Sequence, residues 1–558
     1  MIFRKLGKFW RDIFTVKIHS SWLIAALCGG FLSGVYLSLE LQNSFFANNF
    51  WLVFVAIFLV FIFISRLRIM IFFAIITGII LGIWRGMSVR IDLNIYEEWI
   101  GQNVILRGKI KEDPDFGASG DLRLKIVNPE IILSADYNKL AEDKTENIED
   151  YFTLLPGTIW ASAFSGKEAK RSDQVEISGK LKAGFGVFPA TISFGKLTNI
   201  FSSPNADPAR DIRNIFGEYL RKIIPSPESD LGMGILAGQK TALPLELSSA
   251  FMIAGLTHIV VASGYNLTIL IRFARRLFAK ISRFAALGFG GILVFSFACV
   301  TGFSPSMTRA SLVAGLSLLA WYYGRKFHPV VLITFVAAIT IMLDPSSLWG
   351  DAGWWMSFTS FVGVIILAPL VKSYFWGNEP DLRKKPSLMQ KIRAKFQEIF
   401  AKFKLPFTKN SAKKFDKSAK NFGEKSHTFR GIFIETLSAQ IMASPIIALF
   451  MGQFSPFGLL ANLAILWLLP LTMLLTFIAG IGAFILPHFL AEIVAFPANF
   501  LLNYIIEIAR FVAELPGASQ SVNIGFWPII GIYFLIFIAI IYLKNRTKYN
   551  FRDNNIVE

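Results

Sequence analysis

The chain has few cysteines, few histidines and few charged residues. Its 558 residues include 2 Cys and 5 His, and charged residues make up 17% of the total. Cys28 and Cys299 both lie in apolar runs, so neither a disulfide framework nor a paired-cysteine zinc motif can form. A soluble globular protein would carry about 25% charged residues. The composition argues against a chain that folds entirely in water, and we expect no metal and no cofactor.

Long apolar runs dominate what is present. Hydrophobic residues make up 54% of the chain, Phe alone counts 55, and the mean hydropathy is +0.53. Runs of this length and apolarity are typical of membrane-spanning helices. We predict about twelve spans, near residues 20–40, 50–64, 69–88, 252–271, 284–302, 307–323, 329–343, 357–371, 431–450, 457–485, 489–511 and 526–543. The run 457–485 is long enough to contain a break.

Residues 90–210 differ from the rest of the chain. Apolar and polar residues alternate there in short runs, such as Val104, Leu106 and Ile110, and turn clusters separate the runs. A period of two between turns predicts short β-strands, and a small barrel or sandwich follows. Residues 211–225 then show the spacing of an amphipathic helix that ends at Pro225.

The positions of the charges predict the orientation. With the N-terminus inside and the spans alternating, the inner segments hold 34 Lys and Arg against 8 Asp and Glu. This excess is the positive-inside pattern, and it accounts for the net charge of +18. The β block then lies outside. It is mildly acidic, so its net charge does not favour a grip on phosphates.

The predicted fold class is a polytopic α-helical membrane protein with an inserted extracytoplasmic β domain. The Lys-rich segment 372–430, which we call the basic linker, is either a helix on the lipid surface or a loosely ordered segment. Contact with membrane lipid is expected. The predicted regions are an N-terminal membrane region (1–89), the β domain (90–210), a first core part (211–371), a basic cytoplasmic linker (372–430), a second core part (431–545) and a cytoplasmic tail (546–558).

One apolar run contains a cluster of polar residues. Residues 255–270 read GLTHIVVASGYNLTIL, and in a continuous helix His258 and Asn266 would fall within about 80° of each other. Polar side chains in a span usually face a bundle interior or a water-filled cavity. The Ser263-Gly264 pair is also a turn signal, and a break there requires protein or water beside it. Hydrogen bonds between packed helices would explain the same residues.

Further polar residues interrupt the later runs. Arg309 lies near the outer end of the run 307–323, where it either lines a polar path or extends to the interface. Asp344 and Asp351 flank a turn ahead of Trp354, a residue type common at membrane interfaces. The predicted lining of a translocation path is His258, Ser263, Gly264, Asn266, Arg309, Asp344, Asp351, Trp354, Ser357 and Asn462. We predict no catalytic residue.

Together these segments resemble the ComEC-type competence proteins. Residues 254–270 are similar to the family signature through Gly255, Leu256, His258 and the Ser263-Gly264 pair. TGFSPSMTRASLVAG (301–315) is similar to the family's T-G-x-x-P-S-x-x-R-A segment, and DPSSLWGDAGWWMSF (344–358) resembles its D-P-x-x-L segment. SPFGLLANLAILWLLPL (455–471) resembles a later segment through Asn462 and Pro470. The ordered set covers about 230–475.

The resemblance implies an inner-membrane channel for single-stranded DNA, with an OB-like outer domain. It implies an extracytoplasmic DNA receptor and, inside, a helicase-like ATPase or single-strand-binding protein. Two departures matter. Asn266 stands where family members often have a second His. The sequence also has no H-x-H-x-D-H pattern of the metallo-β-lactamase-like domain that many members carry, so we expect any nuclease to be a separate chain.

Two other functions remain open. A small-solute transporter or exporter would also use broken helices near the middle of the membrane. An intramembrane hydrolase would need Ser263 and His258 to meet, but five residues place them about 140° apart on a helix. No Walker A loop is present: the nearest match, at Gly234–Thr241, lacks a Gly-Lys pair. Translocation would therefore depend on a cytoplasmic motor or on the proton gradient.

Overall fold

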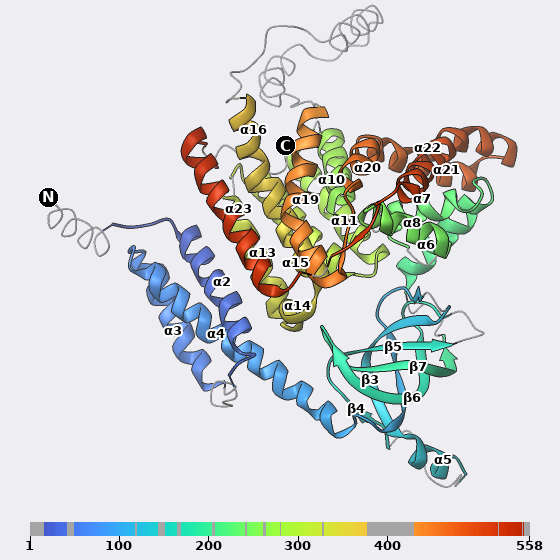
Figure 1. Cartoon of the computed structure of the whole chain (residues 1–558), viewed down its shortest axis with the longest axis horizontal. Coiled ribbons are helices and arrows are strands. Elements are labelled where there is room, and N and C mark those ends of the chain that lie inside the picture. Colours follow the sequence, from blue (N-terminus) through green and yellow to red (C-terminus); the bar gives the residue numbers. More distant parts are fainter. Residues whose placement is uncertain are drawn as a thin grey trace, which may run out of the picture.

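The computed structural model consists of a helical body with a β-barrel at one end (Figure 1). The body contains the N-terminal helices on one flank and the α6–α8 and α20–α22 helices on the other (Figure 1). The residues that the structure describes are 16–41, 49–117, 120–142, 151–164, 169–202, 207–239, 243–260, 264–279, 281–325, 328–376, 429–522, 524–549 and 551. Most of the predicted linker, 377–428, lies outside them.

The N-terminal region is built on a close helix pair. Helix α2 (Ser20–Leu37) packs along α4 (Met70–Leu93), and α3 (Phe50–Ser65) joins them. Gly30 and Gly34 of α2 lie directly against the backbone of Ile75 and Ile79, where any Cβ would collide. Small residues allow this approach in a membrane, where van der Waals packing drives association. Arg90 of α4 donates to the Leu39 carbonyl at 2.6 Å, beyond the end of α2.

The β domain begins directly after α4, through the short 3₁₀ helix η2 (Asn94–Glu98). Its strands are β1 (Asn103–Ile110), β2 (Asp115–Phe116), β3 (Leu122–Leu133), β4 (Thr153–Leu154), β5 (Thr158–Phe164), β6 (Gln174–Phe185) and β7 (Phe188–Phe201), with α5 (Ser134–Glu142) after β3. Alternating residues such as Leu106, Ile126 and Ile177 fill its core, as the period of two predicts.

Five of these strands close into a ring. Strand β1 pairs antiparallel with β3 and with β6, and β3 pairs antiparallel with β5. Strand β5 then pairs parallel with β7, and β7 pairs antiparallel with β6. The pairing returns to the strand at which it began, so β1, β3, β5, β7 and β6 form a closed barrel. Strands β2 and β4 are short additions to β3.

Helices occupy the remaining predicted positions, except in one region. They are α6 (Pro208–Arg221), α7 (Glu228–Ala237), α11 (Arg283–Val300), α12 (Pro305–Tyr322), α13 (Pro329–Leu343), α14 (Ser346–Gly350), α15 (Ala352–Val362), the π-helical η4 (Gly363–Leu367), α16 (Ala368–Trp376), α19 (Phe429–Met451), α20 (Gly458–Leu466), α21 (Leu469–Ile485), α22 (His488–Glu514) and α23 (Phe526–Thr547). Strands β8 (Gln453–Phe454) and β9 (Gln520–Ser521) form a small ribbon. The exception is 252–271, which was predicted as one span with a turn signal at Ser263-Gly264, and where a helix ends at Ile253 ahead of a left-handed turn at Gly255.

Seven of the described helices are long and apolar enough to cross a membrane. An eighth crossing results if α20 and α21, which meet at a bend of 53°, form one broken span. That bend lies within the run 457–485, in which a break was predicted. Helix α23 is only 6% buried, and its large apolar side chains face outward. The protein is therefore mostly helical, with several apolar helices and a separate β region, as expected of a membrane protein.

One contact joins the start of α22 to the end of α6. The ring of His488, at the start of α22, lies 3.2 Å from the carbonyl oxygen of Lys222, just after α6. The turn between α21 and α22 therefore lies beside the end of α6.

Candidate translocation site

The signature 255–270 is a chain of short helices. Helix α8 (Leu245–Ile253) ends at Ala254, α9 (Thr257–Val260) is a single turn, and α10 (Gly264–Phe278) begins after a gap in the described residues. Gly255 has φ of +69°, which favours glycine, and a Cβ there would approach Ser455 within 3.3 Å. The turn at Gly255 therefore lets α8 stop while the chain packs against the start of α20.

His258 lies in α9 and Asn266 lies in α10, and residues 261–263 between them lie outside the described residues. The side chain of His258 is exposed, whereas Asn266 is fully buried and its Nδ2 donates to the Ile235 carbonyl at 3.0 Å. The two side chains therefore differ in exposure, and the single polar arc, which requires a continuous helix, stays a prediction. Asn266 joins α10 to α7, and Ser263 lies outside the described residues.

Arg309 and Asp351, two of the predicted lining residues, form a pair. Arg309 Nη1 lies 3.5 Å from Asp351 Oδ2, and Nη2 donates to the Gly353 carbonyl at 3.0 Å. The other carboxylate oxygen of Asp351 accepts from the Gly353 amide at 2.8 Å and caps α15. Arg309 is 6% exposed, so it does not extend to an interface. The pair joins α12 to α15 within the helical body.

The other predicted residues are placed as follows. Asp344 is exposed and accepts from the Ser346 amide at 3.1 Å, which holds the turn after α13. Trp354 is buried and donates to Thr340 Oγ1 at 3.1 Å. Ser357 is half-buried and Asn462 is buried in α20. Gly264 lies against α12, where a Cβ would meet that of Ala310 at 3.3 Å.

Two of the contacts between the barrel and the helical body form what we call the barrel dock (Arg171, Gly302, Gly186 and Gly350). The guanidinium of Arg171 lies against Gly302, where a Cβ would collide with it, and donates to the Val300 carbonyl at 3.0 Å. The hairpin residue Gly186 lies against the backbone of Gly350. Both body segments belong to the runs 301–315 and 344–358, and Gly350 immediately precedes Asp351. These segments therefore support the barrel.

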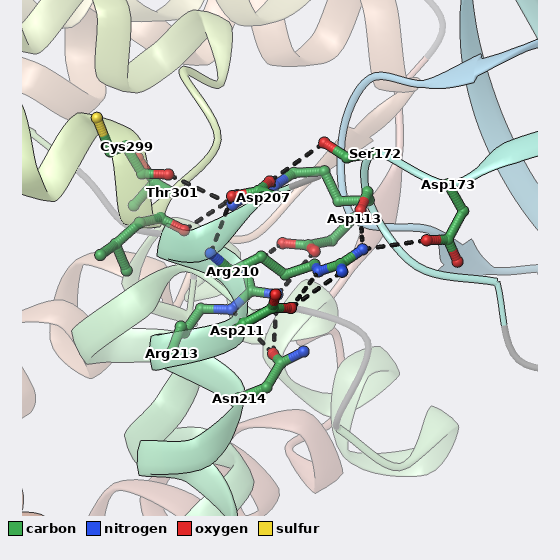
Figure 2. A network of polar contacts seen from close by, with 12 residues as sticks. Asp113, Ser172, Asp173, Asp207, Arg210, Asp211, Arg213, Asn214, Cys299 and Thr301 are labelled. Atoms are coloured by element: carbon green, nitrogen blue, oxygen red, sulfur yellow. Dashed lines mark hydrogen bonds and ion pairs between the residues drawn. The ribbon is translucent and has the colours of Figure 1, made fainter. Parts of the chain in front are cut away.

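A network of ion pairs surrounds the Arg171 contact (Figure 2). Arg171 Nε lies 2.7 Å from Asp207 Oδ2, Arg210 Nη1 lies 3.1 Å from Asp173 Oδ1, and Arg213 Nη2 lies 2.8 Å from Asp113 Oδ1. The three arginines come from the barrel and from α6, so the network ties the helix to the barrel. Such buried pairs are costly to break because the remaining charge loses its partner.

Asp207 is the hub of this network. Its Oδ1 accepts from the Arg210 amide at 2.9 Å, and its Oδ2 accepts from Arg171 and from the Ser172 hydroxyl. Burial by itself would raise the pKa of Asp207, but the hydrogen bonds from Arg171, Arg210 and Ser172 outweigh it and hold that pKa below its ordinary value. The carboxylate therefore stays ionised throughout the physiological range.

Helix α10 carries a polar face that the sequence reasoning missed. Successive residues are about 100° apart, so Tyr265, Arg272 and Arg276 lie within an arc of about 40°, opposite the buried Leu267 and Ile271. Tyr265 is 40% exposed, and its hydroxyl donates to the Leu466 carbonyl at 3.4 Å. The signal was available, because a spacing of seven and then four residues predicts one face.

The outer surface of the barrel carries aromatic and basic side chains together, which we call the barrel face. Backbone pairing aligns Lys182, Thr191, Trp160 and Lys125 in one row across β6, β7, β5 and β3. Phe185, 56% exposed, packs edge-on against the Trp160 ring at 5.5 Å. Because the net charge of 90–210 is acidic, composition concealed this local arrangement.

Comparison with known proteins gives one family. The sequence model of the family described as "Competence protein" matches residues 235–546. An "Uncharacterized protein" of Aquifex aeolicus (strain VF5) is 25% identical over 171 residues, which are 30% of this chain and 40% of that protein. No solved structure matches the chain. Among the described residues, no group of three or more His, Cys, Asp and Glu could hold a metal ion.

Proposed function

The chain belongs to the competence protein family, and from this premise we propose that it conducts single-stranded DNA across the bacterial inner membrane during natural transformation. Family membership supports a role in DNA uptake. The observation that carries the channel proposal is a set of exposed polar side chains inside the matched, otherwise apolar region: His258, Tyr265 and Glu435. Polar residues in a membrane span usually face a water-filled cavity or a bundle interior, and exposure favours the first.

The outer barrel is the proposed first contact for the strand. Its strand pairing supports an OB-like assignment, in which oligonucleotides bind across the second and third strands of the ring and the adjoining loops. The barrel face lies on β3 and β5 and on the β6–β7 hairpin. Aromatic rings that stack on bases, beside cations that hold phosphates, suit a single strand of any sequence. The same β6–β7 hairpin contains Gly186 of the barrel dock. A DNA strand bound on the barrel face would therefore lie beside α14.

We propose a multi-pass arrangement with both termini in the cytoplasm. About twelve crossings result if the shorter helices α3 and α13, the helix α12 and the broken α8–α10 segment are counted with the eight above. The proposed partners are single-stranded DNA, membrane lipid, an extracytoplasmic DNA receptor, and a cytoplasmic helicase-like ATPase or single-strand-binding protein. We propose that the chain is not an enzyme and that any nuclease is a separate protein.

Deletion of the gene tests the proposal. Loss of both cytoplasmic entry of labelled DNA and transformation is expected, with recovery when the wild-type gene is restored. Normal entry in the deletion strain would refute the channel. A small-solute transporter predicts normal transformation and an altered solute gradient instead.

The purified chain provides a second test. We expect it to bind single-stranded oligonucleotides and to leave them uncut, since nuclease activity is assigned elsewhere. Replacement of Trp160 and Phe185 by Ala is expected to weaken this binding, because stacking contributes about 1–3 kcal/mol per base. The matched control is replacement of Phe116 by Ala. This aromatic residue of β2 is 47% exposed and lies outside the row through Trp160.

A further inference from the structure

Strand β7 contains one extra residue between Ile192 and Gly195. Strands β5 and β7 lie side by side in the barrel (Figure 1), where Ile192 faces Ala161 of β5 and Gly195 faces the second residue after it. The pairing of β7 with β6 shifts its register along the same stretch. This irregularity is a β-bulge, a feature that re-aims a side chain and is common next to functional sites. The side chain turned outward here is that of Phe194, which is 63% exposed.

The bulge holds Phe194 in a strained backbone conformation. Its φ of +56° lies in the left-handed region, which bulky residues rarely adopt. Its amide donates to Ser162 Oγ at 2.9 Å, and Ser162 is buried. A slip of β7 by one residue would place a side chain at Gly195, where a Cβ would lie 2.8 Å from Ile177. Such strain persists only where the surroundings enforce it, and it clusters at functional sites. Because the ring of Phe194 points to solvent, packing of the barrel core does not account for the strain.

Phe194 forms an exposed pair with Phe164, the last residue of β5. The two ring centroids are 5.9 Å apart, the ring planes differ by 18°, and Phe164 is 52% exposed. Across the β5–β7 pairing, Phe164 faces Lys196, whose side chain is exposed. We call Phe164, Phe194 and Lys196 the bulge cluster. Exposed rings beside a cation are the features to which the bases and phosphates of a single strand bind.

The bulge cluster lies on the same outward side of β5 as Trp160 of the barrel face. Successive side chains of a strand alternate between its two sides, and Ile159, Ala161 and Ala163 fill the barrel core. Trp160 and Phe164 therefore both point outward, and the four residues between these positions correspond to about 13 Å. A stacked DNA strand advances about 3.4 Å per base, so this distance corresponds to about four bases.

We propose, resting on the DNA binding proposed for the barrel face, that the bulge cluster is a second base-stacking subsite for the same strand. One strand then occupies both subsites and follows β5, with Lys196 beside its phosphates. Oligonucleotide binding to an OB-like barrel is centred on the second and third strands of the ring, and this path extends the site to β7. The combined site takes at least about five nucleotides, within the range of about 4–16 for one such barrel.

The test uses full-length protein in nanodiscs and fluorescent single-stranded oligonucleotides of two lengths. Phe194→Gly is expected to weaken binding of a strand of about twelve bases about tenfold, the effect of one lost base stack. A strand of about three bases spans only about 10 Å and cannot bridge the two subsites. Its affinity is expected to stay nearly the same, because it still binds at Trp160. Phe194→Trp, which keeps an aromatic ring, is expected to bind both strands as the wild type does.

The choice of glycine separates binding from folding. Glycine adopts a positive φ without strain, so the unfolding temperature of Phe194→Gly is expected to stay near that of the wild type. The matched control is Phe303→Gly in the helical body. Phe303 is 51% exposed and has φ of +51°, but it lies outside the barrel. Its replacement is expected to leave the affinity for both strands unchanged.

The inference is overturned if Phe194→Gly binds the longer strand as tightly as the wild type, or if it weakens binding of both strands equally. In either case, weaker binding after replacement of Trp160 and Phe185 leaves the barrel face as the proposed contact. If neither set of substitutions weakens binding, the proposed contact between the barrel and DNA fails together with this inference.

Discussion

Two groups of polar residues lie in the family-matched region, and they differ in burial. Asn266, Arg309 and Trp354 are buried, and each has a hydrogen-bond partner on a different helix. His258, Tyr265 and Glu435 are exposed. The difference teaches that polar residues in apolar runs need not all serve helix packing. The buried group holds helices together, and we assign the exposed group to the path of the DNA.

Arg309→Leu is expected to have the largest effect on the buried group. Removing one partner of a buried ion pair costs about 3–5 kcal/mol, because the other charge is left without compensation. Thermal unfolding of the purified protein in one detergent measures the loss. The double variant Arg309→Met with Asp351→Asn is the control, since Asn can still cap α15 and no charge is left unpaired. A double variant as unstable as the single one would contradict the ion-pair account.

Asp207→Ala extends the comparison to the barrel dock. The substitution leaves the buried Arg171 without its carboxylate partner. We expect the free energy that holds the barrel to the helical body to fall by about 3 kcal/mol, with no change inside the barrel. Hydrogen exchange checks this, with faster exchange at α6 and at the end of α11 but not inside the barrel. Uniformly faster exchange would show that Asp207 supports the whole fold instead.

Asn266→Leu tests a neutral member of the buried group. The Ile235 carbonyl would lose its donor, and an unsatisfied buried group costs about 1–3 kcal/mol. Protein that inserts despite this loss should still conduct DNA. If Asn266→Leu abolished uptake at full stability, Asn266 would belong to the exposed group by function.

His258→Leu should show the opposite pattern. Exposed substitutions usually change stability by less than about 0.5 kcal/mol, so melting should be unaffected while cytoplasmic entry of labelled DNA falls. Thr257→Val, at the exposed neighbouring position, is the control. Normal uptake in His258→Leu would remove this residue from the proposed path.

Acid is expected to have the smallest effect. The lowered pKa of Asp207 means that its contribution to stability is complete above its ordinary value of 3.8 and is lost only as the pH falls through the lower value in the folded protein. Attachment of the barrel should therefore not change between pH 5 and pH 8. Detachment within that range would mean that another group controls the dock.

The sequence predicted the elements better than their contacts. Helices follow from apolar length, and strands follow from a period of two, so the predicted positions hold except at 252–271. That run differs because a left-handed turn at Gly255 interrupts a stretch that hydropathy reads as continuous. Nothing local indicated this turn, and the turn signal at Ser263-Gly264 stays a prediction because Ser263 lies outside the described residues.

The sequence allowed us to select the residues of the candidate site, but it did not allow us to predict which of them contact one another. Arg309 and Asp351 were both selected as lining residues, yet their pairing depends on how α12 and α15 meet, which spacing along one helix does not contain. Gly302 was selected as part of a motif, and only the barrel explains why a side chain cannot stand there. The barrel face was missed because net charge averages over both sides of the domain.

Thiol labelling tests the difference between the two groups most directly. In a Cys28→Ser, Cys299→Ser background, single cysteines are placed at His258, Tyr265 and Asn266 in membrane-embedded protein. A water-soluble thiol reagent is predicted to label positions 258 and 265 but not 266, and a single-stranded oligonucleotide is predicted to protect the first two. Failure to label position 258, or labelling that the oligonucleotide leaves unchanged, would contradict the assignment of the exposed group to the DNA path.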